Sequence, residues 1–194
     1  MKKVWIAVVA FAVMGVLASA QEKTKEMEGQ QRLAAYQAAN APNEHHEFLK
    51  KFSGDWGVQM TFWTAPGKPP VTSRATAMSD VRFGGRFLFI SFTGEMMGKP
   101  FAGQQIVGYD NMEKMYNTFY MDNTSTHIFV TKGVRLGDVI SETGSWPDPV
   151  TGRVSGVHAR TTFLNNDEYR YEQFMVQDDG TEVKMLELRC QRKK

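Results

Sequence analysis

Hydrophobic and polar residues alternate with a period of two along most of the chain, from Trp56 to the C-terminal end. Short runs rich in Val, Ile, Thr, Phe and Tyr are separated by turn sequences that contain Gly, Pro, Asn or Asp. This is the pattern of β-strands joined by turns. We therefore predict ten strands, which lie at residues 56–64, 71–81, 86–94, 101–109, 115–122, 126–132, 138–146, 154–164, 168–176 and 182–192.

The connections between these predicted strands are short. Antiparallel neighbours can be joined by a turn, whereas parallel neighbours need a long crossover, so the chain is predicted to be an antiparallel meander. A meander of this length avoids exposed strand edges by closing on itself. We predict a mainly β protein, a single antiparallel up-and-down β-barrel of about ten strands, in a domain over residues 44–194. An open two-sheet sandwich is the alternative.

One segment before the barrel changes to the helical period. His45, Phe48, Leu49 and Phe52 are spaced at i, i+3, i+4 and i+7, which places them on one face of a helix. Asn43 stands before this segment as an N-cap. We therefore predict a short N-terminal helix that packs its apolar face against the barrel.

The first twenty residues have the composition of a secretory signal peptide. Lys2 and Lys3 are followed by an apolar run at 4–17 and then by small residues that end at Ala20. The run is shorter than the roughly 20 residues of a membrane-spanning helix, although an uncleaved anchor is the alternative. We expect residues 1–20 to be removed after Ala20, which makes the protein periplasmic or secreted, with no membrane anchor after cleavage.

The composition of the remaining chain argues against some classes of binding partner. Removal of residues 1–20 takes away two lysines and no acid, which lowers the net charge from +2 to zero. A neutral chain has no electrostatic attraction to nucleic acid or to anionic membranes.

Residues 21–43 are polar and charged, and we predict a linker that can become helical. Cys190 is the single cysteine, so no internal disulfide forms, and its strand spacing indicates a buried thiol.

The faces of the predicted strands are mixed. In 115–122, an aromatic and polar face contains Tyr120. In 154–164, His158 and Arg160 share one face. A solid core would be more uniformly apolar, so these faces indicate an interior with room for a small ligand. If Arg160 points inward, its guanidinium suits an anionic head group, and if outward, it is a solvated side chain.

Several short motifs resemble a known bacterial family, the domain of unknown function 1579. They are GGRFL at 84–88, GEMMGKPFAG at 94–103, GYDN at 108–111, DNTST at 122–126 and PDPVTG at 147–152, together with Pro42, His46, Leu49, Gly54 and Trp56. The resemblance covers residues 31–192 and implies a small lipocalin-like β-barrel. It implies no activity.

The Gly-x-Trp of residues 54–56 also resembles the motif that opens the lipocalin barrel. In that family the tryptophan closes one end beneath a basic residue of the last strand, which implies that Arg192 stacks on Trp56. His46 is expected to form a hydrogen bond where the helix meets the barrel. A core tryptophan beside a tight turn describes the same packing without a ligand.

No cofactor or metal is implied by the sequence. A haem needs one protein nitrogen on its iron, so His127 and His158 keep a haem-binding barrel as an alternative. No cluster of Cys and His indicates zinc, and neither G-x-S-x-G nor H-E-x-x-H occurs. The sequence thus contains no recognisable catalytic motif.

We predict a non-enzymatic protein that binds a small amphipathic or hydrophobic ligand in its barrel. The candidate ligand-binding residues are Trp56, Tyr120, His127, His158 and Arg160. One alternative is an accessory protein with a solid barrel and a contact surface for another protein. A second is an enzyme that uses a polar barrel mouth. Neither the ligand nor the oligomeric state follows from the sequence.

Overall fold

The computed structural model describes residues 25–64, 67–149 and 151–194. The expected signal peptide, residues 1–20, lies outside the described residues. The chain divides into two units, residues 1–41 and 42–194. In the first unit the described residues form a helix over residues 25–39 with exposed side chains. None of the helices in the described part of the chain has both the length and the apolar character needed to cross a membrane.

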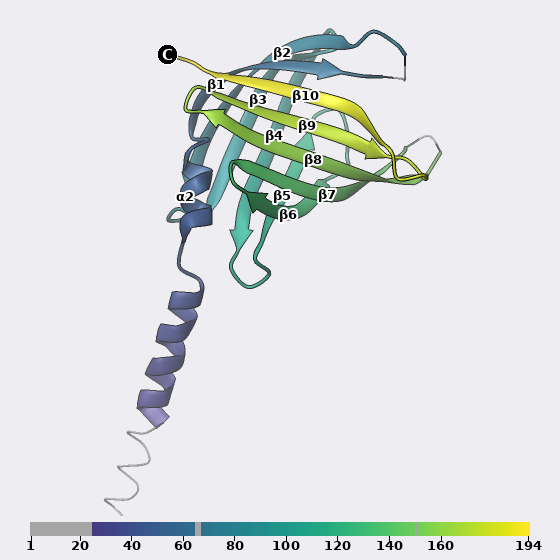
Figure 1. Cartoon of the computed structure of the whole chain (residues 1–194). Helices are drawn as coiled ribbons and strands as arrows, with labels where there is room; N and C mark the ends of the chain where they lie inside the picture. Colours follow the sequence, from purple (N-terminus) through teal and green to yellow (C-terminus); the bar gives the residue numbers. More distant parts are fainter. Residues whose placement is uncertain (1–24, 65–66, 150) are drawn as a thin grey trace, which may run out of the picture. The chain divides into compact units, whose positions relative to one another are not determined.

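The second unit is one short helix followed by ten strands (Figure 1). They are α2 (Glu44–Lys50), β1 (Gly54–Phe62), β2 (Val71–Arg82), β3 (Phe87–Met96), β4 (Lys99–Asp110), β5 (Met115–Asp122), β6 (Phe129–Leu136), β7 (Val139–Pro147), β8 (Val154–Asn165), β9 (Glu168–Val176) and β10 (Glu182–Arg192). Each strand pairs antiparallel with the next, and β1 pairs with β10, which closes the barrel. The predicted fold class is therefore confirmed.

The sixth strand was predicted at the wrong place. We expected it at residues 126–132, whereas β6 spans Phe129–Leu136. The residues before it form a turn that its own side chains hold together. The Asp122 carboxylate accepts from the Thr124 backbone N–H at 2.8 Å, and the Ser125 hydroxyl accepts from the His127 N–H at 3.0 Å. Such side chain–backbone bonds compete with strand pairing.

Helix α2 begins at a capping box. The Asn43 side chain accepts from the His45 backbone N–H at 3.0 Å, and the His46 Nδ1 accepts from the Asn43 N–H at the same distance. These bonds satisfy backbone donors that a helix start otherwise leaves free. His46, Phe48 and Leu49 form its buried face. The helix thus packs at one end of the barrel, against β2, β3 and β4.

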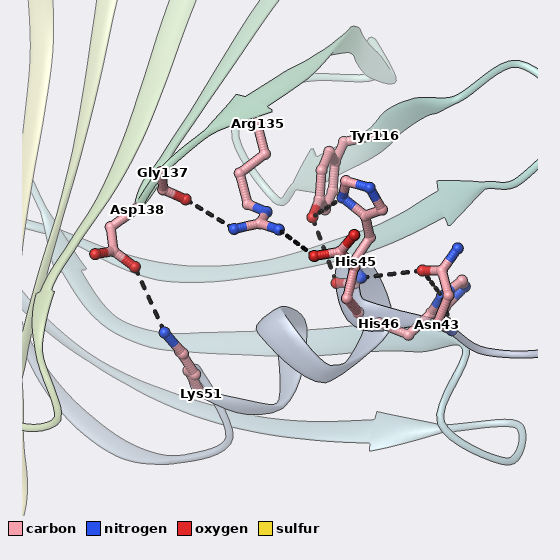
Figure 2. Close-up of polar contacts among 9 residues, drawn as sticks. Asn43, His45, His46, Lys51, Tyr116, Arg135, Gly137 and Asp138 are labelled. Carbon is pink, nitrogen blue, oxygen red and sulfur yellow. Dashed lines mark hydrogen bonds and ion pairs between the residues drawn. The ribbon is translucent and has the colours of Figure 1, made fainter.

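Polar contacts fix this helix end on the barrel (Figure 2). Arg135 of β6 lies 3.6 Å from the Glu44 carboxylate and donates to the Gly137 carbonyl at 2.8 Å. The His45 Nδ1 lies 3.1 Å from the Tyr116 hydroxyl of β5. Since these partners come from different strands, the helix is held across the end of the barrel rather than along one strand.

Candidate ligand-binding cavity

The barrel encloses a cavity of about 360 Å³. This volume falls in the range of natural small-molecule sites, roughly 300–1,000 Å³. Most of its lining is apolar or aromatic, from Leu49, Phe52, Met60, Phe62, Leu88, Ile90, Phe92, Met96, Phe101, Val107, Phe129, Ile140, Trp146, Tyr169, Met175, Met185, Leu186 and Leu188. The interior therefore leaves room for an apolar molecule.

One end of the cavity is closed by a floor made of Leu49, Phe52 and Tyr169. The Phe52 and Tyr169 rings meet edge to face with their centroids 5.2 Å apart. Beneath them lies Trp56, which is fully buried and whose ring centroid is 4.7 Å from that of Tyr169. Trp56 therefore supports the floor and does not itself line the cavity.

Arg192 of β10 holds the chain together below this floor. Its guanidinium carbon lies 4.1 Å from the centroid of the Trp56 ring, a distance at which cation and ring attract. The same guanidinium donates to the carbonyls of Ser53 at 2.7 Å and Lys51 at 3.0 Å. The Trp56 indole N–H donates to the Phe52 carbonyl at 2.9 Å. The last strand thus binds both the tryptophan and the backbone that follows α2.

His46 joins α2 to the barrel as well as to its own N-cap. Burial is the main cause that lowers its pKa, and Arg86 lowers it further, while a hydrogen bond with the backbone of Tyr109 acts in the opposite direction. That bond joins α2 to β4. The His46 ring also meets the Tyr109 ring edge to face, with the ring centroids 5.9 Å apart.

A buried carboxyl group lines the deep part of the cavity. Glu142 of β7 is 3% exposed, and the Thr118 hydroxyl donates to its Oε1 at 2.7 Å. Burial raises the pKa of Glu142, and hydrogen bonds from Thr118 and Thr131 oppose that rise. Burial is the main cause that raises the pKa of Tyr171, and the nearby negative charge of Glu142 raises that pKa further.

A second acid stands at the mouth, which we define by Met96, Asp122 and Trp146 at the strand ends away from α2. The Tyr120 hydroxyl donates to the Asp122 carboxylate at 2.8 Å, and the Thr124 hydroxyl donates to its other oxygen at 2.7 Å. Burial and then the bond to Asp122 raise the pKa of Tyr120. Asp122 is therefore already satisfied by its neighbours.

The structure places two predicted binding residues on the outside of the barrel. In β8 the buried positions are Val157, Ala159 and Phe163, so the alternate residues His158 and Arg160 point outward. His158 lies 2.6 Å from the Glu182 carboxylate, and Arg160 donates to the same carboxylate at 3.2 Å. Neither lines the cavity. The solvated alternative for Arg160 therefore describes its position, and both residues lie outside the cavity.

Tyr120 and His127 differ in their relation to the cavity. Tyr120 lines it, as a ligand-binding candidate should. His127 does not line it, but its ring meets that of Trp146 edge to face at 5.3 Å, just behind the mouth. Because His158 is also outside, the described lining offers no imidazole to a haem iron. No group of three or more His, Cys, Asp or Glu in the described chain is arranged to hold a metal ion.

Sequence reasoning missed Glu142, the most buried acid of the site. The signal was its position in the run Ile140-Ser-Glu-Thr-Gly144, where it shares a strand face with the apolar Ile140. A charged residue on the apolar face of a strand marks either a packing cost or a functional group.

Comparison with known proteins gives a family and a fold. The model of a family described as "Protein of unknown function (DUF1579)" matches residues 41–192. No curated protein matches the chain. The crystal structure of Rv2717c from M. tuberculosis is similar with a TM-score of 0.55 and 16% identity, covering 79% of this chain and 100% of that one. A redesigned β-barrel, also 16% identical, gives a TM-score of 0.41 over 75% of this chain and 95% of that one.

Proposed function

The chain belongs to this family of unknown function, DUF1579, and we propose that it is a non-enzymatic protein that binds a small amphipathic molecule inside its barrel. The observation that carries this proposal is the cavity of about 360 Å³ with its apolar lining and few polar groups. Binding sites for small molecules have this composition, because apolar contact supplies affinity and a few polar groups fix orientation.

The floor supports the same proposal. Leu49 and Phe52, from α2 and the turn after it, cover one end of the barrel and also line the cavity. In a barrel packed solid by its own side chains, these two residues would contact other side chains instead of bordering a cavity. Well-packed interiors contain few voids larger than a water molecule, so a space of this size favours a ligand.

The proposal includes export. The predicted signal peptide at residues 1–20 and the single cysteine suit a protein that acts outside the cytoplasm without disulfides. Intact-mass measurement of protein from the periplasm or the medium tests this part. A mature chain that starts at Gln21 is the expected result. A full-length chain in the cytoplasmic fraction would overturn export without touching the binding proposal.

Native mass spectrometry of protein purified without detergent is the first test of binding, since a retained ligand adds its own mass. A titration with the neutral fluorescent probe N-phenyl-naphthylamine then measures whether the cavity takes an apolar molecule. We expect saturable binding of one probe per chain.

Two valine substitutions locate the bound probe. Val107 of β4 lines the cavity, whereas Val130 of β6 is 39% exposed on the outer surface of the barrel. Val107→Phe should fill part of the cavity and weaken probe binding by about tenfold, which is about 1.4 kcal/mol. Val130→Phe makes the same chemical change outside and should leave binding unchanged. Equal binding by both variants, or no saturable binding by the unmodified protein, would overturn the proposal.

A further inference from the structure

The charged groups of the cavity all have one sign. Among the described lining residues, Glu142 and Asp122 are the acids, and none is Lys, Arg or His. Arg160, which would have suited an anion if it pointed inward, lies on the outer surface. The cavity therefore lacks the group that a fatty acid or another anionic ligand would need, and an anion would lie beside like charges.

Glu142 is buried without a cation to balance it. No ion pair joins Glu142 to another described residue, and the groups that donate to it are the hydroxyls of Thr118 and Thr131. An ionised carboxyl has about four acceptor positions, so two hydroxyl donors leave part of its capacity free on the cavity side. A buried carboxylate without a partner is costly. A bound cation would offset that cost.

The two acids differ in what they offer a ligand. Asp122 already accepts from Tyr120 and from both the backbone and the hydroxyl of Thr124. Glu142 instead lies at the level of Thr118, four residues nearer to α2 along β5 than Asp122. The deeper acid is therefore the better partner for a charged head group.

The surrounding wall suits a cation as well as an alkyl chain. Aromatic rings on the cavity come from Phe92, Phe101, Phe129, Trp146 and Tyr171, among others. The faces of such rings attract ammonium groups, by about 0.5–2 kcal/mol depending on how far the cation is desolvated. Their bodies bury apolar surface, which supplies the larger share of affinity.

From these observations we infer that the cavity takes a cationic amphiphile, an alkyl or aryl amine whose ammonium group binds the Glu142 carboxylate while its apolar part fills the aromatic space. This inference rests on the proposed function, because it names the ligand class of the same cavity. It assigns Glu142 as the residue that decides between cationic, neutral and anionic ligands of the same shape.

Three eight-carbon probes test the inference on the unmodified protein. Octylamine, octanol and octanoate share one chain and differ in head-group charge at neutral pH. Each is titrated as a competitor of N-phenyl-naphthylamine. We expect octylamine to bind at least about tenfold more tightly than octanol and octanoate to bind most weakly. This ranking needs no variant, so it decides the question even if a substitution prevents folding.

Two glutamate substitutions then locate the head group. Glu142→Gln keeps the shape and removes the charge, and it should weaken octylamine binding by about tenfold while leaving octanol within about twofold. Glu182→Gln removes the same charge from the outer surface, where Glu182 contacts His158 and Arg160. This control should leave the binding of all three probes unchanged.

The outcomes separate the inference from the function on which it rests. If octanol or octanoate binds as tightly as octylamine, or if Glu142→Gln binds octylamine like the unmodified protein, the cationic ligand class is wrong although the cavity still binds ligands. If neither N-phenyl-naphthylamine nor any eight-carbon probe binds, the proposed function itself fails.

Discussion

Replacement of Trp56 by alanine tests how the closed end of the barrel is held. The Trp56 side chain is fully buried, in contact with the Tyr169 ring on one side and with the Arg192 guanidinium on another. Deleting a buried aromatic ring costs about 3–5 kcal/mol of unfolding free energy, because apolar contact is lost and a cavity remains. We expect a value in the upper half of this range, since Arg192 also loses its ring partner.

Little of that loss should come from the indole hydrogen bond. The Phe52 carbonyl, which accepts from the Trp56 N–H, also accepts from the Ser79 hydroxyl at 2.5 Å. It therefore keeps a donor in the variant, and the penalty for an unsatisfied buried carbonyl is avoided. The expected destabilisation is therefore a packing effect, and its magnitude measures how strongly Trp56 supports the floor of the cavity.

Urea unfolding provides the assay, with the midpoint compared at an unchanged slope. Trp63→Ala is the matched control, because Trp63 is only partly buried and its ring faces Lys184 at 5.3 Å. We expect it to cost about 1 kcal/mol. If Trp56→Ala costs no more than Trp63→Ala, Trp56 does not support the floor. A double-mutant cycle between Trp56→Leu and Arg192→Met should give a coupling of about 1 kcal/mol.

A buried carboxyl, imidazole and thiol each give a further measurable outcome. Burial raises the pKa of Glu142 above its ordinary 4.5. The protonated carboxyl therefore favours the folded state at low pH, and the free energy of unfolding falls as pH rises from 4.5 through the folded-state pKa. Glu142→Gln should remove this fall from urea midpoints measured against pH and stabilise the protein at neutral pH; an unchanged profile would contradict the assignment. Burial and then Arg86 lower the pKa of His46 below its ordinary 6.5, so stability is complete above 6.5 and declines as pH falls from there through the folded-state pKa. His46→Gln, whose amide can still cap the helix, should flatten that part of the profile, and a decline of the original size would refute the attribution. Burial raises the pKa of the Cys190 thiol to about 12, so Ellman's reagent should modify it only as the protein unfolds, at a rate that increases with urea, whereas rapid reaction in native buffer would show the thiol to be accessible.

The strand pattern predicted the barrel well because two independent signals agreed. Alternation located the strands, and the short turns between them left antiparallel pairing between neighbours as the simple topology. Closure followed from the need to cover strand edges. The sixth strand was misplaced because Asp122 and Ser125 extend a turn by bonds that periodicity does not detect.

The site was harder to predict than the fold. Alternation divides a strand into two faces, but it does not state which face is inside when both contain polar and apolar residues. In β8 the apolar Val157 and Ala159 mark the inner face, and hydrophobicity alone would have placed Arg160 outside. Glu142 was missed because a charged residue is expected on the outer face, and the hydrogen bond that satisfies it inside cannot be seen in the sequence. The hydroxyl that donates to Glu142 comes from Thr118 of β5, a strand that is not adjacent to β7.

The ligand class that we propose depends on one register in the sheet. In the pairing of β7 with β8, Glu142 lies opposite Ala159 on the inner face, and Ser141 lies opposite Arg160 on the outer face. A shift of one residue in either strand reverses which of its side chains points inside. With Arg160 inside, the barrel would complement an anion, which is one of the two alternatives that the sequence left open for this residue. With Glu142 inside, the same ten strands and the same aromatic wall complement a cation. The general shape of the cavity is therefore compatible with either charge, and the side-chain alternation along β7 and β8 selects between them.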